Sequence, residues 1–165
     1  MLFADVAKDR EVEGDLMLGD MGQGMPFRAG AFDGALSVSA LQWLCNADKS
    51  SHKPAKRLSC FFTSLYACLS RSARAVFQFY PENSDQVELV TSQAMRSGFH
   101  GGVLVDYPNS TKAKKFFLVL MTGGPQVMPK ALTDANSMAE GQSKQAQFIN
   151  KRHHADGSLL LLFSL

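Results

Sequence analysis

The sequence predicts an α/β fold in which apolar strands alternate with amphipathic helices and an antiparallel strand pair closes the pattern. Two long segments place apolar residues at helical spacing, and several short apolar runs end at glycine, proline or aspartate. The last two runs, 102–108 and 115–121, are joined by a short polar turn. A parallel crossover needs a dozen or more residues, so these two strands are expected to be antiparallel.

Three further strands are expected at 14–20, 32–39 and 73–80. The first is a short apolar run that stops at a polar, glycine-containing loop. The apolar and small residues of the second suit a strand that is covered on both faces, as in a parallel sheet. The third alternates in polarity and stops at Pro81. We therefore expect a three-layer arrangement with five strands.

Two helices are expected, one between the strands at 32–39 and 73–80 and one between the strands at 73–80 and 102–108. Residues 2–10 could be the end of another helix. Pro54 is well placed near a helix start. The apolar residues after it recur at helical spacing, namely Leu58, Phe61, Phe62, Leu65 and Leu69. Asn83 or Ser84 is expected to cap the next helix, which ends at Gly98.

The chain is expected to form one domain at 1–124, followed by a tail at 125–165. Residues 126–157 are polar, rich in Met, Ala, Gln and Ser, and lack periodicity, so they are interpreted as loop or disorder. The composition changes abruptly at residues 158–165, which are rich in leucine, and no role in the domain is predicted for them.

Composition and charge exclude a wholly disordered chain and weaken the case for an RNA-binding protein. Hydrophobic residues make up 45% and charged residues 19%, which is ordinary for a globular protein. A formal net charge of +2 indicates no strong basic field, which weakens the case for RNA binding without excluding it. The longest apolar run, 159–163, is far shorter than the roughly 20 residues of a membrane span. No membrane association is expected, and the acidic start does not resemble a secretory signal.

The cysteines and histidines do not form a recognisable site. Cys45, Cys60 and Cys68 are odd in number and lack paired spacing, so we expect reduced, buried side chains. Cys60 and Cys68 are expected on one helix, too far apart for a disulfide. The four histidines are scattered or lie in the tail, so no metal site is expected.

Candidate binding residues follow three of the predicted strands, because ligands of open α/β sheets sit beyond the carboxyl ends of strands. The Asp20 carboxylate could accept a hydrogen bond from an adenine amino group, and Met21 could pack on the ring. After the second strand come small residues, an amide and an indole, namely Ser39, Ala40, Gln42 and Trp43. After the third come an aromatic ring, a rigid proline and two polar residues, namely Tyr80, Pro81, Glu82 and Asn83.

Each of these features also has a purely structural interpretation. Asp20 could simply cap a loop, and Trp43 alone is more often a core residue. Tyr80 and Pro81 form a common end to a strand. The sequence contains no GxGxxG fingerprint. From spacing alone, the chain is a Rossmann-like domain with an unknown ligand.

Several segments resemble one known family. They are 13–27, which contains Asp-Met-Gly-Gln-Gly; 32–47, which contains Gln-Trp-Leu-Cys-Asn; Tyr-Pro-Glu-Asn-Ser at 80–84; and 101–116. They are similar to the eukaryotic 18S ribosomal RNA guanine-N7 methyltransferases, the family associated with the Williams–Beuren deletion region. The resemblance extends from residue 1 to about residue 124. It implies the C-terminal part of a class I methyltransferase domain, with a Rossmann-like sheet that lacks its first strands.

The resemblance implies S-adenosyl-L-methionine as the cofactor and methyl transfer to guanine N7 of 18S rRNA as the reaction. Asp20 and Met21 would lie at the adenine end, and Ser39 and Ala40 at the methionine part. The guanine pocket would be bordered by Gln42, Trp43, Tyr80, Pro81, Glu82 and Asn83. N7 is already a nucleophilic lone pair, so no catalytic base is assigned.

The resemblance also implies partners and a cellular location. The partners would be 18S rRNA in the pre-40S ribosomal particle and a small zinc-binding methyltransferase activator subunit in a heterodimer. The activator is expected to cover an edge strand at 16–18. The location would be the nucleus (nucleolus and nucleoplasm) and the cytoplasm.

The family's glycine-rich loop is not found in this sequence, which should weaken cofactor binding. A non-catalytic fragment that binds only the activator is therefore the alternative. A nicotinamide-dependent enzyme is disfavoured by the antiparallel strand pair.

Overall fold

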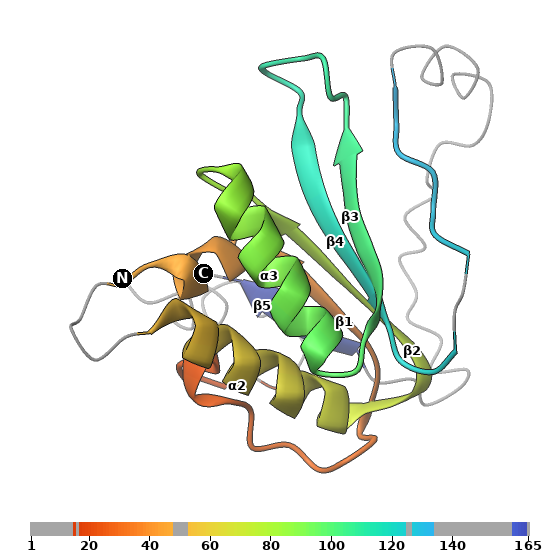
Figure 1. The fold of residues 1–165 in the computed structure, drawn as a ribbon. Coiled ribbons are helices and arrows are strands. Elements are labelled where there is room, and N and C mark those ends of the chain that lie inside the picture. Colours follow the sequence, from red (N-terminus) through yellow and green to blue (C-terminus); the bar gives the residue numbers. More distant parts are fainter. Residues whose placement is uncertain (1–14, 16, 48–52, 125–126, 134–159, 165) are drawn as a thin grey trace.

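The computed structural model describes residues 15, 17–47, 53–124, 127–133 and 160–164 (Figure 1). Two α-helices, five strands and two short 3-10 helices (η) are found there. In chain order they are η1 (Met21–Gln23), β1 (Phe32–Val38), η2 (Leu41–Cys45), α2 (Pro54–Cys68), β2 (Leu69–Phe79), α3 (Ser84–Arg96), β3 (His100–Asp106), β4 (Lys115–Met121) and β5 (Leu160–Ser164).

The strands form one mixed sheet in the order β3-β4-β2-β1-β5. β1 is parallel to β2 and to β5, whereas β4 is antiparallel to both β2 and β3. The predicted α/β class and the predicted antiparallel pair at 102–108 and 115–121 are therefore confirmed.

The register brings three segments to one edge of the sheet. Val38 at the end of β1 pairs with Gln78, and Phe79 at the end of β2 pairs with Phe116 at the start of β4. The loops that follow β1 and β2 therefore leave the sheet side by side, with the β3–β4 turn beside them. Ligands of open α/β sheets bind at this carboxyl edge.

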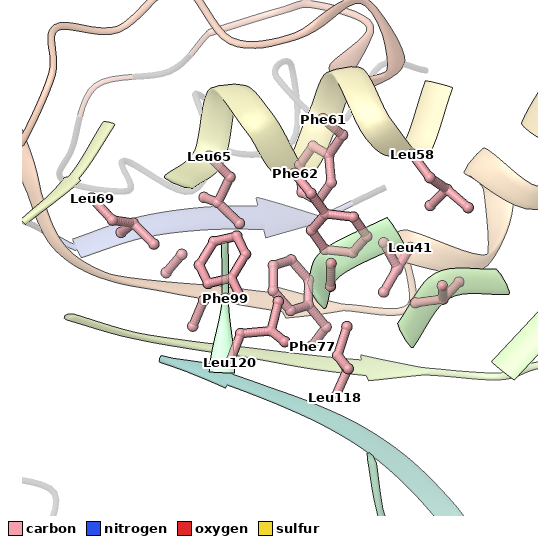
Figure 2. Close-up of a cluster of buried hydrophobic side chains, with 14 of the residues drawn as sticks. Leu41, Leu58, Phe61, Phe62, Leu65, Leu69, Phe77, Phe99, Leu118 and Leu120 are labelled. Atoms are coloured by element: carbon pink, nitrogen blue, oxygen red, sulfur yellow. The ribbon is translucent and has the colours of Figure 1, made fainter. Parts of the chain in front are cut away.

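Both α-helices form where local signals favour them. Pro54 occupies the first turn of α2, and Asn83 caps α3 by accepting a hydrogen bond from the Gln86 N–H at 2.9 Å. The buried face of α2 packs on the sheet through fully buried rings, with Phe61 and Phe62 against Phe77 (Figure 2). The predicted apolar stripe of this helix is confirmed for Leu58, Phe61, Phe62 and Leu65, whereas Leu69 is the first residue of β2.

The two α-helices lie on the same face of the sheet, contrary to the three-layer expectation (Figure 1). The sheet order explains this. The connections from β1 to β2 and from β2 to β3 progress in one direction, so right-handed crossovers place both helices on one side. On the other face, Leu36 and Val38 of β1 remain 37% and 47% exposed. Within the described ranges, no helix covers that face.

The strand predicted at 14–20 is wrong. Residues 15 and 17–20 have no regular structure, and Met17 and Leu18 are 55% and 77% exposed. A strand requires a partner along its backbone, and the edge of β1 that faces away from β2 is paired with β5 instead. The possible helix end at 2–10 lies outside the described residues.

The leucine-rich run near residue 160 does belong to the sheet. Gly34 to Val38 pair in parallel with Leu160 to Ser164, so the expectation that 158–165 have no role in the domain is wrong for this strand. A continuous short apolar run suits a parallel strand, but its partner cannot be recognised from local sequence. Leu132 also contacts the sheet, since its N–H donates to Asp106 Oδ1 at 2.8 Å. The domain boundary at residue 124 stays a prediction.

The cysteines follow the expectation in part. Cys60 and Cys68 share α2 and all three thiols are free, but Cys60 is exposed rather than buried. No helix in the described part of the chain is long and apolar enough to cross a membrane.

Candidate functional site

The loop after β1 is held in an unusual conformation by β2. Ser39 has a φ of 55°, in the left-handed region that non-glycine residues seldom occupy. Its N–H donates to the Gln78 carbonyl at 2.9 Å, and its hydroxyl donates to Gln78 Oε1 at 3.2 Å. Ala40, the next residue, is 1% exposed. The neighbouring strand therefore fixes the first turn of the loop.

Gln42 tightens the same loop from the other side. Its Nε2 donates to the Ser39 carbonyl at 2.9 Å, whereas its Oε1 is buried and has no hydrogen-bond partner among the described residues. Trp43 is 51% exposed, so the interpretation of Trp43 as a core residue is wrong. Tyr80, which follows β2, is 50% exposed. Two half-exposed aromatic rings thus flank the carboxyl edge.

Asp20 has a structural role that the sequence left open. Its carboxylate caps η1 by accepting the Gly22 N–H at 2.9 Å, and it forms an ion pair with Arg57 at 2.8 Å. Burial is the largest influence on the pKa of Asp20 and acts to raise it. The hydrogen bond from Gly22 and the hydrogen bond and charge of Arg57 nevertheless lower that pKa below its usual value. Asp20 is therefore ionised at neutral pH.

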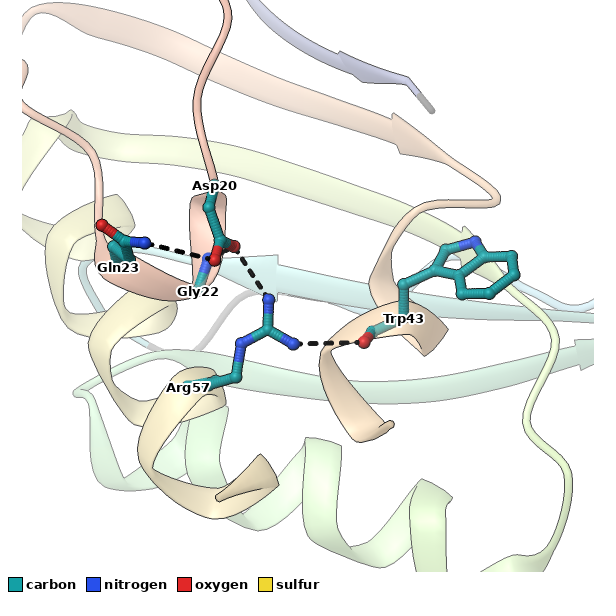
Figure 3. A network of polar contacts seen from close by, with 5 residues as sticks. All are labelled: Asp20, Gly22, Gln23, Trp43 and Arg57. Carbon is teal, nitrogen blue, oxygen red and sulfur yellow. Dashed lines mark hydrogen bonds and ion pairs between the residues drawn. The ribbon is translucent and has the colours of Figure 1, made fainter. Parts of the chain in front are cut away.

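Arg57 links Asp20 to the segment that carries Trp43 (Figure 3). The second guanidinium nitrogen of Arg57 donates to the Trp43 carbonyl at 3.4 Å, while the indole ring points away from it. Gly22 leaves room for this cation, since a Cβ at position 22 would lie 2.5 Å from Arg57 Nε. Met21 is partly buried against the core. The loop before β1 and the 3-10 helix after it are thus joined through α2.

Glu82 is oriented by the first turn of α3. Its backbone N–H donates to Gln86 Oε1 at 3.1 Å, and its carboxylate accepts from Gln86 Nε2 at 3.2 Å. Pro81, Glu82 and Asn83 line an open hollow of about 840 Å³, whose other wall is formed by α3 with Lys114 and Phe116. The Lys114 ammonium lies 5.1 Å from the centre of the Phe116 ring. None of Asp20, Ser39 and Trp43 lines this hollow.

Cys45 does not provide a nucleophile for this region. Burial, followed by the negative charge of Glu82, raises the pKa of Cys45 to about 11. The thiol is therefore protonated at neutral pH, and the thiolate is the reactive form. The effect also indicates that the Glu82 carboxylate is close enough to η2 to influence it.

The structure thus joins the predicted residues in three groups. Asp20 contacts the Trp43 segment through Arg57. Ser39 is bonded to both Gln42 and Gln78, and residues 81–83 line the hollow beside α3. Sequence reasoning missed Arg57, Gln78 and Gln86. They lie inside a predicted helix or strand, and only the fold brings them to the site.

Several curated proteins are similar to this chain over most of its length. It is 60% identical over 148 residues to the 18S rRNA (guanine-N(7))-methyltransferase of Mus musculus, covering 90% of this chain and 52% of that protein. It is 66% identical over 121 residues to the corresponding methyltransferase of Arabidopsis thaliana, covering 73% and 42%. The Saccharomyces cerevisiae 18S rRNA (guanine(1575)-N(7))-methyltransferase is 57% identical over 116 residues, covering 70% and 42%. Over most of its own length, the chain is therefore similar to the 18S rRNA guanine-N7 methyltransferases.

The match to this family is partial in length. The chain spans about half the length of the curated relatives it matches. No protein-family profile matches the chain. Among solved structures, a SAM-dependent methyltransferase from Aquifex aeolicus is similar with a TM-score of 0.48 and 13% identity, covering 72% of this chain and 60% of that one. A candidate DNA modification methylase from Thermus thermophilus, complexed with S-adenosyl-L-methionine, is similar with a TM-score of 0.48 and 10% identity, covering 68% of this chain and 57% of that one.

Proposed function

We propose that this chain is part of an S-adenosylmethionine-dependent methyltransferase that acts on guanine N7 of 18S ribosomal RNA. The observation that carries the proposal is its identity of 60% over 148 residues to the mouse enzyme of that name. The sheet supports it, because the loops after β1 and β2 leave the same edge, where ligands of open α/β sheets bind.

Four residues are proposed to hold the cofactor. Asp20 and Met21 would contact the adenine end of S-adenosylmethionine, and Ser39 and Ala40 the methionine part. The strained Ser39 and the buried Oε1 of Gln42, which has no hydrogen-bond partner among the described residues, suit a polar ligand at this loop. When bound, the cofactor supplies an electrophilic methyl group on a sulfonium.

The guanine would be held between the loops after β1 and β2. Trp43 and Tyr80 offer half-exposed rings on which a base could stack. Gln42, Pro81, Glu82 and Asn83 would border the base. Because guanine N7 carries a lone pair, the chain needs no general base. Its residues bind the base, orient N7 for in-line attack and exclude water.

The proposal extends to partners and location on family resemblance. The substrate would be 18S rRNA in the pre-40S particle, in the nucleus (nucleolus and nucleoplasm) and the cytoplasm. The small zinc-binding activator subunit would form a heterodimer with the chain. Exposed apolar side chains at Met17 and Leu18 support a protein contact near the start of the described residues. This contact would use side chains rather than an edge strand.

Methyl transfer in vitro tests the proposal. The S. cerevisiae relative would be rebuilt with its matched segment replaced by that of this chain, then incubated with methyl-labelled S-adenosylmethionine and an 18S rRNA fragment. We expect label in N7-methylguanosine, and none when the target guanosine is replaced by 7-deazaguanosine, which lacks N7. A correctly folded hybrid that transfers no label would instead favour a non-catalytic fragment.

A further inference from the structure

Gln78 has an unusual place for an amide side chain. It lies one residue before the end of β2 and is only 8% exposed, although amide side chains are mostly found at the surface. Its backbone carbonyl accepts the Ser39 N–H at 2.9 Å, and its Oε1 accepts the Ser39 hydroxyl at 3.2 Å. The backbone N–H and the side-chain hydroxyl of Ser39 are therefore both anchored on this one residue.

The other end of the Gln78 amide has no such anchor. Its Nε2 is buried without a hydrogen-bond partner among the described residues. Buried polar atoms of this kind are rare in native proteins, and each needs an explanation. Gln42, which holds the Ser39 carbonyl, likewise has a buried Oε1 without a partner in the described part of the chain. Two amides thus converge on Ser39, and each keeps one buried atom unused.

The backbone at Ser39 points to ligand binding as well. A serine with a φ of 55° is strained, and such residues persist where the surrounding structure fixes them, often at ligand-binding sites. The hydrogen bonds that Ser39 donates to Gln78 and accepts from Gln42 fix this conformation. The next residue, Ala40, is small and buried, which allows a ligand to approach the backbone closely.

We propose that Gln78 is a further binding residue for S-adenosylmethionine, whose Nε2 donates a hydrogen bond to the carboxylate of the cofactor's amino-acid end. This inference rests on the proposed function, which assigns Ser39 and Ala40 to the methionine part. A carboxylate suits the unused donor because hydrogen bonds to charged groups are stronger than neutral ones. Gln78 would thus do two things, holding Ser39 with its oxygen and the ligand with its nitrogen.

Two ligands separate this role from a structural one. S-adenosylhomocysteine keeps the amino-acid end, whereas 5′-methylthioadenosine lacks it. Gln78→Glu retains an acceptor for the Ser39 hydroxyl but replaces the free donor with a negative charge. Gln93→Glu is the matched control, because Gln93 of α3 is also buried, at 7% exposed, and lies away from Ser39. Affinities would be measured on the full chain by NMR titration, which also measures weak binding.

We expect Gln78→Glu to weaken S-adenosylhomocysteine binding by about tenfold or more, the usual effect of losing a hydrogen bond to a charged group. Binding of 5′-methylthioadenosine should not change, and Gln93→Glu should affect both ligands equally or not at all. If Gln78→Glu does not fold, Gln78→Met should show the same selective loss without adding charge.

Other outcomes overturn the inference in distinguishable ways. Equal losses for both ligands would mean that Gln78 only supports the fold, and unchanged affinity would mean that its nitrogen does not face the cofactor. Weaker binding of guanosine monophosphate with unchanged S-adenosylhomocysteine binding would place the amide at the base instead. If the unmodified chain binds neither adenosine ligand, its residues do not form the proposed cofactor site by themselves, and the inference fails for this chain.

Discussion

The carboxylate of Asp20 lies 2.8 Å from the guanidinium of Arg57, and this ion pair joins the loop before β1 to the first turns of α2. The same guanidinium reaches the Trp43 carbonyl at 3.4 Å. One cation therefore fixes two of the segments that are proposed to bind cofactor and substrate. The side chains of Arg57 and Asp20 are 16% and 35% exposed, so solvent screens the pair only in part.

A double-mutant cycle measures this ion pair. Asp20→Asn keeps a side chain that can cap η1 but removes the charge, and Arg57→Gln removes the cation. We expect the two changes to be non-additive, with a coupling free energy of about 0.5–1 kcal/mol for a partly exposed pair. Urea unfolding of the four proteins provides the measurement. Additive effects would mean that the contact contributes nothing to the free energy of unfolding.

The contribution of Asp20 should depend on pH. The folded pKa of Asp20 is lower than its unfolded value, which is about 3.9 for an ordinary aspartate. Its ionised form therefore stabilises the fold above that pH, and this stabilisation is lost as pH falls through the folded pKa. The stability difference between the unmodified chain and Asp20→Asn should be constant from about pH 5 to 8 and shrink below about pH 4. A difference that grows on acidification contradicts this account.

Asp20→Ala separates the binding role from the capping role. In the hybrid with the yeast relative, a lost hydrogen bond to adenine should weaken cofactor binding by roughly 1.5–3 kcal/mol. Asp20→Asn should weaken it less, because the amide oxygen can still accept. Isothermal titration calorimetry gives the affinities. A lower melting temperature with unchanged affinity would mean that Asp20 only caps η1 and pairs with Arg57, and does not bind the cofactor.

Substitutions at Met17 test the proposed contact with the activator subunit. Met17 is 55% exposed and has no regular backbone structure, so a side-chain contact predicts that Met17→Asp reduces co-purification of the two proteins. Met17→Pro should be tolerated better, because no strand ladder is broken there. The readout is the ratio of the two chains after co-expression. Loss with proline but not with aspartate would instead indicate pairing through the backbone.

Local signals account for most of the predicted fold. Pro54 and Asn83 mark the starts of α2 and α3, and the short turn between β3 and β4 fixes their antiparallel pairing. The pairing of β1 with β5 could not be predicted, because it joins segments far apart in the chain and a parallel partner has no local signature. The run at 16–18 resembled a strand only because its exposure was unknown.

The site residues divide in the same way into those that local sequence predicts and those that only the tertiary structure brings together. Strand ends marked Ser39, Trp43 and Tyr80 as candidates, since ligands bind at the carboxyl edge of such sheets. The residues that hold them were not predictable. Arg57 is 37 positions from Asp20, and Gln78 is 39 positions from Ser39, so both contacts depend on tertiary structure.

The most direct test of the central claim is N7-methylguanosine in 18S rRNA of S. cerevisiae cells. The cells would lack their own relative and produce the hybrid that carries the matched segment of this chain. Methylation can be read by chemical cleavage at N7-methylguanosine followed by primer extension. We predict restored cleavage at the site that the yeast enzyme methylates, and reduced cleavage when Trp43 and Tyr80 are both changed to alanine. A hybrid present at the level of the yeast enzyme that leaves this guanosine unmethylated would contradict the assignment.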